Sequence, residues 1–483
     1  MKLGKWSLAV ALVVLVIFPA NVLAEKITIN WWHAHGGRLG ELVNGIADGF
    51  NKSQNKYHLV ATYKGNYADT MTAGIAAFRA KNPPHILQVF EVGTATMMAA
   101  KGAIKPVYEV MAESGLPFDP NAYLPTVTSY YTTIDGKMLS MPFNSSTPIL
   151  WYNVDAFKKA GLDPDKPPKT WPEVAEYAKK ILKAYQDQAA KIEPVVRKLE
   201  EAKSVLLSAG YKENAEKLDQ MINETKRNIV TSGLSTAWIS WIQIENFSAW
   251  HNVPIGTEEN GFGGLDTKFV YNSPLHVRHI QQLADWQKDK IFVYGGRRNL
   301  GDPKFEIGEV AMITESSAGY ARFKANCKFE FRTGMLPYWP DVPGAPQNTI
   351  IGGASLWVLR GHPAEEYKGV ATFFNYLSSP EVQSEWHKAT GYLPITIAAY
   401  ELTKKEGFYE ENPDMETALI QMTLHKPTPN SKGLRFGNFL QVRDINYNEL
   451  EAIFAGQKSA KQGLDDAVSS GNKLLRKFEE MYK

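Results

Sequence analysis

The chain has 483 residues, of which 44% are hydrophobic and 22% charged, a composition typical of globular proteins. This length is comfortable for two domains. The 53 lysine and arginine residues nearly balance the 51 acidic ones, which leaves a formal net charge of +2. Because polyanions are bound through an excess of basic charge, neither nucleic acid nor an anionic membrane is expected as a partner.

The first 24 residues have the pattern of a secretory signal peptide. Two lysines precede an apolar run at 8–18, and a small-residue pattern ends at Ala24. The run is too short for a membrane span, which takes about 20 apolar residues. We therefore predict cleavage after Ala24 and export of the mature chain to the periplasm.

The cysteine content supports a freely soluble mature chain. Cys327 is the sole cysteine of the sequence, so no disulfide can form within the chain. A lipid anchor would require a cysteine at the predicted new N-terminus, where the sequence has Glu25. We expect a periplasmic protein with no membrane span in its mature part.

Strand-like and helix-like patterns alternate in the first hundred residues. KITINWW (26–32), YHLVATY (57–63) and HILQVF (85–90) are predicted strands, and apolar residues recur at helical spacing between them. Such alternation predicts βαβ units and a parallel sheet. Ligands of these sheets bind beyond the carboxyl ends of the strands, so the segments after each strand are candidate binding segments.

The segment FNSSTPILWYN (143–153) sets four small polar side chains directly before a strand-like apolar run. We predict that only its second half is a strand. Together with the hairpin-like stretch 132–143, it is expected to cross between two domains. The hydroxyls of Ser145 and Ser146 would then face a polar ligand in the cleft.

The middle of the chain differs in composition from the rest. A capping box formed by Thr170 and Glu173 predicts a helix start. Residues 184–227 are rich in Lys, Glu, Gln and Ala, and Pro194 and Gly210 are predicted to divide them into two or three helices. We favour a solvent-facing amphipathic insertion over an arm dedicated to docking a partner. Further strands are predicted at 310–314 and 348–359.

Motifs for catalysis and cofactor binding are lacking in the sequence. It contains no GxxxxGK[ST], HExxH or GxSxG pattern. His33 and His35 have no third metal ligand at an obvious spacing. We predict no cofactor, no metal and no enzymatic activity, although a glycosidase pair of carboxylates can be neither found nor excluded.

Seven ordered blocks of the chain resemble one family, the periplasmic sn-glycerol-3-phosphate-binding proteins of ABC uptake systems. The resemblance extends over residues 27–483, and the blocks are 64–80, 86–98, 142–153, 241–250, 345–358, 391–396 and 432–438. It is interrupted by the insertion at about 184–231, which the usual member lacks. It also departs at His35, where relatives commonly have methionine.

The resemblance implies an α/β fold of the type II periplasmic-binding-protein class, with two lobes that close on a ligand. Each lobe would be a mixed sheet flanked by helices. Residues 25–142 and about 311–356 are expected to form the first lobe. The second lobe is expected to contain 143–310 and about 357–483, including the helical insertion.

Matched position by position, the resemblance implies seven ligand-contacting residues and two aromatic residues of the cleft. The seven are Tyr67, Glu91, Ser146, Ser316, Gly353, Tyr392 and Arg443, and the two are Trp238 and Trp241. We expect Arg443 to bind the phosphate and Glu91 to accept from glycerol hydroxyls at the opposite end. Ser316 would begin a helix whose N–H groups also favour an anion.

The implied function is capture of glycerol 3-phosphate, with glycerophosphodiesters as further possible ligands. The expected partners are ABC permease subunits and their ATPase, which must be separate chains. Two alternatives stay open: an oligosaccharide-binding protein of the same fold, and a secreted phosphodiester or glycoside hydrolase. The presence of Arg443 with Glu91 argues against a neutral sugar.

Overall fold

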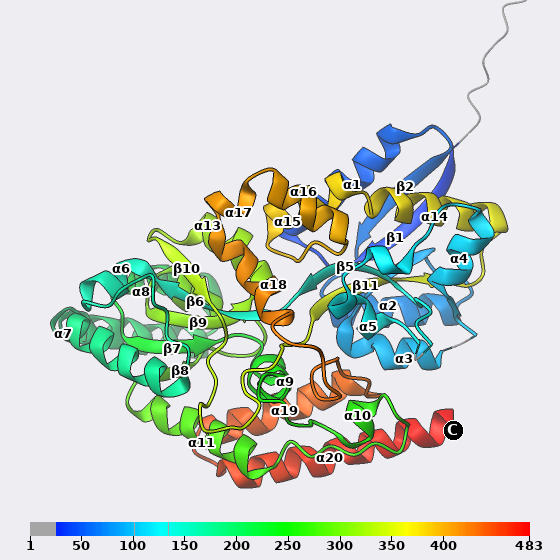
Figure 1. Cartoon of the computed structure of the whole chain (residues 1–483). Helices are drawn as coiled ribbons and strands as arrows, with labels where there is room; N and C mark the ends of the chain where they lie inside the picture. The colour runs from blue at the N-terminus through cyan, green and yellow to red at the C-terminus, as the bar shows by residue number, and fades with distance from the viewer. Residues whose placement is uncertain (1–25, 101, 134) are drawn as a thin grey trace, which may run out of the picture.

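The computed structural model describes residues 26–100, 102–133 and 135–483 (Figure 1). The predicted signal peptide, 1–24, lies outside the described residues. None of the described helices combines the length and apolar character that a membrane span requires. The described chain forms two sheets flanked by helices, which confirms the predicted two-lobed α/β class.

The first sheet has the strand order β2-β1-β3-β11-β4, and β5 pairs with the other end of β11. Its strands are β1 (Ile27–His33), β2 (Tyr57–Tyr63), β3 (Ile86–Phe90), β4 (Ile104–Lys105), β5 (Met141–Ser146) and β11 (Gly352–Leu359). β1 is parallel to β2 and β3, as the βαβ pattern predicts, whereas β11 is antiparallel to its partners.

The second sheet has the order β10-β6-β9-β7-β8 and is also mixed. Its strands are β6 (Pro148–Asn153), β7 (Ser232–Thr236), β8 (Phe292–Tyr294), β9 (Val310–Ser316) and β10 (Phe331–Gly334). β7 is parallel to β8 and β9, and β6 is antiparallel to β9 and β10.

Helices surround both sheets, and apolar residues at helical spacing explain why they pack there. In α1, for example, Val43, Ile46 and Phe50 are buried on one face. The helices near the first sheet are α1 (Gly37–Ser53), α2 (Tyr67–Arg79), α3 (Thr94–Ala99), α4 (Val107–Ser114), α5 (Pro125–Tyr131) and α14 (Ala364–Leu377). Those near the second are α6 (Val154–Lys159), α7 (Trp171–Ser208), α8 (Lys212–Lys226), α11 (Pro274–Lys288), α12 (Asp302–Glu306) and α13 (Tyr320–Asn326).

The remaining helices connect or cover the two halves (Figure 1). They are α9 (Phe247–Trp250), α10 (Thr257–Gly261), α15 (Pro380–Thr390), α16 (Ile397–Lys405), α17 (Phe408–Glu411), α18 (Thr417–Met422), α19 (Phe439–Phe454) and α20 (Ala460–Tyr482). Short 3₁₀ turns are η1 (Glu91–Gly93), η2 (Pro120–Ala122), η4 (Ser317–Gly319) and η5 (Pro413–Glu416), and η3 (Trp241–Asn246) is a π-helix.

The predicted division of the chain between the lobes is wrong in three places. β9 and β10 fall in the range assigned to the first lobe, yet they pair with β6 in the second sheet. The end of β11 and helix α14 fall in the range assigned to the second lobe, yet they pack with β3 and β1. β5 belongs wholly to the first sheet, so the crossing is at Thr147 rather than at residue 142. Strand periodicity predicts a strand but not the sheet that it joins.

FNSSTPILWYN is the crossing between the sheets, as predicted, but its polar half is also a buried strand. A second crossing runs beside it, just before β11. Thr147 Oγ1 lies 2.7 Å from Thr349 Oγ1 and donates to the carbonyl of Ile350 at 3.0 Å. Gln421 Nε2 donates to the Pro148 carbonyl at 2.8 Å and to Thr349 Oγ1 at 3.0 Å. These bonds define the hinge, where the backbone passes between lobes.

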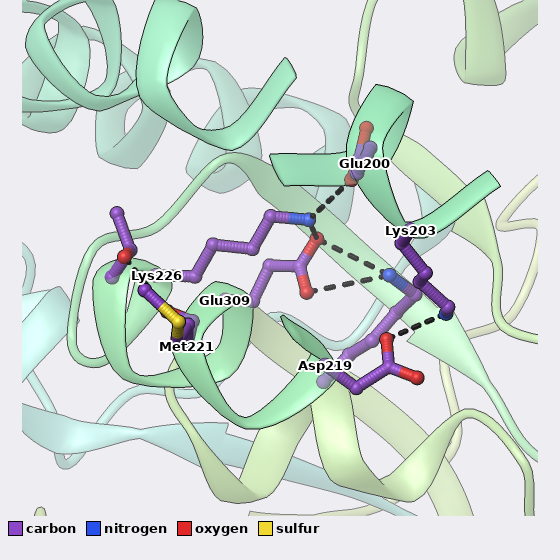
Figure 2. A network of polar contacts seen from close by, with 8 residues as sticks. Glu200, Lys203, Asp219, Met221, Lys226 and Glu309 are labelled. Carbon is purple, nitrogen blue, oxygen red and sulfur yellow. Dashed lines mark hydrogen bonds and ion pairs between the residues drawn. The ribbon is translucent and has the colours of Figure 1, made fainter. Parts of the chain in front are cut away.

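The charged insertion forms two helices rather than three. α7 continues through Pro194, and the chain turns at Gly210 into α8. We call residues 184–227 the arm. Figure 2 shows how ion pairs hold it: Lys203 meets Asp219 at 2.6 Å, and Lys226 meets both Glu200 of α7 and Glu309 of the second lobe at 3.4 Å.

Candidate ligand-binding cavity between the sheets

A cavity of about 190 Å³ is lined by residues of both sheets and of α19. All nine residues that the resemblance implies line this cavity. The other lining residues are Leu39, Phe90, Asn299, Asp302, Glu315, Ala318, Gly319, Arg322 and Gly352. Residues that are up to 404 positions apart in the sequence, Leu39 and Arg443, therefore meet at one place, next to the hinge.

Tyr67 is positioned by the start of α2 and by a chain of hydrogen bonds. Asn66 caps the helix with a capping box, which makes Tyr67 the first helical residue. The Tyr67 ring stacks on Phe90 with centroids 5.4 Å apart. Its hydroxyl accepts from Asn144 Nδ2 at 2.7 Å, and Asn144 Oδ1 accepts from Gln88 Nε2 at 2.7 Å. The orientation of this tyrosine is thus set by the sheet behind it.

His35 lies behind the cavity wall and is buried. Its Nε2 is 2.9 Å from Gln88 Nε2, so it extends the chain that ends at Tyr67. Its ring centroid is 6.0 Å from that of Tyr67 and 5.9 Å from that of Tyr392. Burial, with a contribution from the charge of His33, lowers the pKa of His35 to about 3. His35 is therefore neutral at physiological pH and acts as a hydrogen-bonding core residue.

Arg443 projects from α19 into a buried cluster with two carboxylates. Its Nε and Nη2 donate to Glu245 at 2.8 and 2.6 Å, and Nη2 is 2.6 Å from Glu91 Oε1. The three side chains are 6% exposed or less. Burial alone would lower the pKa of Arg443, but Glu245 and Glu91 together raise it. Burial raises the pKa of Glu91, and Arg443 opposes that shift.

This cluster corrects the expectation that Glu91 and Arg443 lie at opposite ends of the site. They form an ion pair, and with Glu245 the cluster has a formal charge of −1. The arginine is buried, so this is not a surface salt bridge. Glu245 lies 198 residues from Arg443 in the chain, and no sequence pattern links the two.

Small residues from both sheets meet at the hinge end of the cavity. Ser146 pairs with Gly352 in the first sheet, and Ser316 pairs with Pro148 in the second. Gly353 has a φ of +91°, and a Cβ there would lie 1.8 Å from the Asn144 carbonyl oxygen, so only glycine fits. Ser316 directly precedes η4, as predicted, and caps it: its side chain accepts from the N–H of Ala318 at 3.2 Å.

Two tryptophans close one side of the cavity. Trp238 has a φ of +41°, a strained value that is uncommon for a bulky residue. Trp241 lies against Gly352, where a Cβ would come within 2.3 Å of its ring. Trp241 is the first residue of the π-helix η3, which also carries Glu245. π-Helical turns occur often at functional sites.

The wall from the second lobe contains charged residues that sequence reasoning missed. Arg322 Nη1 donates to Asp302 Oδ2 at 2.9 Å, and Arg322 Nε pairs with Glu306. Glu315 is the residue before Ser316 at the end of β9. Its position at a strand end could have marked it as a candidate cavity residue. Asp302 carried no such signal, because it lies in a short helix that no motif marks.

The two lobes, with a cavity beside the hinge between their sheets, define the class of a two-lobed solute-binding protein, and the cavity is its candidate ligand site. A family model described as bacterial extracellular solute-binding protein matches residues 45–417, and the chain belongs to this family. The sn-glycerol-3-phosphate-binding periplasmic protein UgpB of Pectobacterium atrosepticum is 48% identical over 476 residues, covering 98% of this chain and 97% of that protein. UgpB of Yersinia pseudotuberculosis is 47% identical over 483 residues, which cover 100% of this chain and 99% of that protein.

Solved structures show the same fold at low sequence identity. UgpB from Mycobacterium tuberculosis in complex with glycerophosphocholine has a TM-score of 0.71 at 18% identity, over 94% of this chain and 100% of that one. Maltose-bound T. maritima MalE3 has a TM-score of 0.67 at 17% identity, over 93% and 100%. The two-lobed fold is thus shared by proteins with phosphodiester and sugar ligands.

Proposed function

We propose that this chain is the periplasmic substrate-binding component of an ABC importer that captures sn-glycerol 3-phosphate between its lobes. The observation that carries the proposal is the convergence of all nine family-matched residues on one cavity. Relatives at 47–48% identity over nearly the whole chain bear the same description. The ligand would be delivered to permease subunits that act with a separate ATPase.

The size of the cavity supports a small ligand. At about 190 Å³ it falls below the ~300–1,000 Å³ of pockets that enclose drug-sized molecules. An oligosaccharide would require wider separation of the lobes.

We propose that the diol binds at the Arg443 end and the phosphate at the hinge end, the reverse of the expectation for Arg443. A dianion next to two carboxylates would be repelled, whereas hydroxyl groups can donate to Glu91 and accept from Arg443. The hydroxyls of Ser146 and Ser316, and the close backbone approach at Gly353, suit phosphate oxygens. Arg322 lies on that side too, where it pairs with Asp302 and Glu306.

In this proposal the protein binds its ligand without converting it. An oligosaccharide-binding protein and a hydrolase would each give a different result in a binding experiment. Titration calorimetry with glycerol 3-phosphate, glycerophosphocholine, inorganic phosphate and maltose is the direct test. We expect binding of glycerol 3-phosphate, weaker binding of phosphate, and none of maltose. Maltose binding without glycerol 3-phosphate binding would favour the oligosaccharide alternative. Choline release from glycerophosphocholine by the purified protein would instead indicate a hydrolase.

A further inference from the structure

Two carboxyl groups in the cavity wall each have one oxygen bound and one oxygen without a donor. Asp302 Oδ2 accepts from Arg322, and Glu315 Oε1 accepts from the backbone N–H of Ser316 at 2.7 Å. Asp302 Oδ1 and Glu315 Oε2 are buried, and within the described parts of the chain no donor reaches them. Both residues are 3% exposed and line the cavity.

The chemistry of carboxyl groups gives one simple way to satisfy both oxygens. The two side chains lie within hydrogen-bonding reach of each other, and ionised carboxylates can only accept. Two ionised carboxylates side by side at this depth would be strongly unfavourable, because both are buried and the ion pair with Arg322 engages Asp302 alone of the two. A single proton between them gives one oxygen a donor and the other an acceptor, and it removes one charge.

We propose that Asp302 and Glu315 share one proton and that this proton is needed for tight binding of the phosphate group. The inference rests on the proposed function, because it places the phosphate of the ligand at the hinge end beside Ser316. The acid pair is then a specificity-determining part of the site for anionic ligands. Without the proton, the wall would present two adjacent negative charges to a dianion.

The surrounding charges are consistent with a proton on Glu315. The groups that face the pair are Arg322 of α13, Glu306 of α12 and Tyr392. Burial is the main cause that raises the pKa of both carboxyl groups, and the charge of Asp302 raises the pKa of Glu315 further. Arg322 stabilises the ionised form of Asp302, so Glu315 is the donor.

The affinity for the phosphate ligand should decrease as the pH rises. A phosphate dianion next to the pair favours its protonated form, so binding should weaken as the pH rises above the pKa of the ligand-free pair. The dissociation constant should rise by up to about tenfold per pH unit, the limit for one proton. Phosphate monoesters have a second pKa near ~6 and are fully ionised above pH ~8, so the ligand itself does not change there.

The experiment is titration calorimetry of the mature chain with glycerol 3-phosphate from pH 7 to 9.5, on wild type and two variants. Glu315→Gln replaces the titrating proton by an amide N–H, so we expect its dissociation constant to vary less than about threefold over this range. Glu306→Gln is the matched control, since it removes a carboxylate from Arg322 but leaves the pair, and it should keep the wild-type rise. A flat wild-type profile, or equal profiles for wild type and Glu315→Gln, would overturn the proposal.

An infrared measurement without ligand tests the shared proton independently of the ligand assignment. The wild-type protein at neutral pH should show the carbonyl band of a protonated carboxyl group that is lost in Asp302→Asn or Glu315→Gln. Absence of any such band in wild type would refute the shared proton. If the band is present but no pH gives glycerol 3-phosphate binding, the proposed function fails and the acid pair stands.

Discussion

The Glu91–Arg443–Glu245 cluster and the ion pairs of the arm have similar distances but very different surroundings. The cluster has contacts of 2.6–2.8 Å among side chains that are 6% exposed or less. In the arm, Lys203 and Asp219 are also 2.6 Å apart, but their side chains are 31% and 46% exposed. Distance alone therefore does not indicate what an ion pair contributes. Water can replace a lost partner in the arm but not in the cavity.

Replacing Arg443 by alanine should have the largest effect of any single change. It leaves two buried carboxylates without their cation, and breaking a buried pair in this way costs about 3–5 kcal/mol of stability. Ligand affinity should also fall by roughly tens- to thousands-fold. Urea denaturation and calorimetry measure the two effects. Arg443→Lys should be affected less in stability, because it keeps the charge but not the two-point contact with Glu245. A loss below 1 kcal/mol for the alanine variant would contradict the cluster.

Buried histidines also differ from exposed ones, because burial changes the pH at which they take up a proton. Burial lowers the pKa of His276 to about 3 and of His251 to about 4. Each is neutral and hydrogen-bonded. Ser248 and Ser273 contact the two ring nitrogens of His276 at 2.8 and 2.7 Å, and the backbone N–H of Trp339 donates to Nε2 of His251 at 2.9 Å.

These buried histidines make the stability of the fold depend on pH. The unfolded chain takes up protons on its histidines below pH ~6.5, whereas the folded chain does not. Stability should therefore be full above pH ~6.5 and should fall as the pH drops toward 4. At pH 5 each such histidine is expected to cost about 2 kcal/mol. Thermal melts between pH 7.5 and 5 measure the change, and a constant melting temperature over that range would rule out neutral buried histidines.

Substituting Glu91 by glutamine tests the proposed direction of the ligand. The amide keeps the shape of the side chain but is a weaker acceptor for the diol, and hydrogen bonds to charged groups contribute about 1.5–3 kcal/mol. Glycerol 3-phosphate should bind roughly ten- to a hundredfold less tightly, whereas inorganic phosphate should bind nearly as before. Ser316→Ala is the matched variant at the other end and should weaken both ligands. Equal losses of both ligands in Glu91→Gln would place the phosphate beside Glu91.

Most of the architecture could be predicted from local pattern, and its assembly could not. Strand periodicity located β1, β2 and β3 within one residue, and the capping box of Thr170 marked the start of α7. The assignment of β9 and β10 failed because sheet membership depends on which strand edges are unpaired after folding. Pro194 did not end α7, because an exposed helix with a long partner tolerates the loss of one hydrogen bond.

The membership of the cavity could be predicted only through the resemblance, and its electrostatics could not be predicted at all. Ser316 also caps η4, an ordinary structural role that does not by itself indicate a ligand contact, whereas Gly353 pairs regularly with Ser145 and the irregularity of β11 lies after Ala354. The pairing of Arg443 with Glu245, and of Asp302 with Glu315, joins segments that no pattern relates. Which charged side chains pair depends on which segments the fold brings together, and local patterns in a single sequence do not show this.

Shortening the arm should have the smallest effect and would complete the comparison with the cluster. Lys203 faces Asp219 and Glu200 faces Lys226, so α7 and α8 run side by side here and a short turn can be designed between residues 199 and 224. Replacing 200–223 by a Gly-Ser turn removes these exposed pairs, each of which contributes about 0–1 kcal/mol. Lys226 would keep its contact with Glu309 of the second lobe.

We expect the shortened protein to bind glycerol 3-phosphate within about threefold of wild type, because no lining residue of the cavity lies in the arm and long surface insertions are cheap to remove. Lys203→Ala is the milder control, and its free energy of unfolding should change by less than about 1 kcal/mol. Calorimetry and urea denaturation on the same samples separate binding from stability. A large loss of affinity with an unchanged unfolding curve would mean that the arm acts on the cavity through the second sheet, and that exposed charges here matter as much as buried ones.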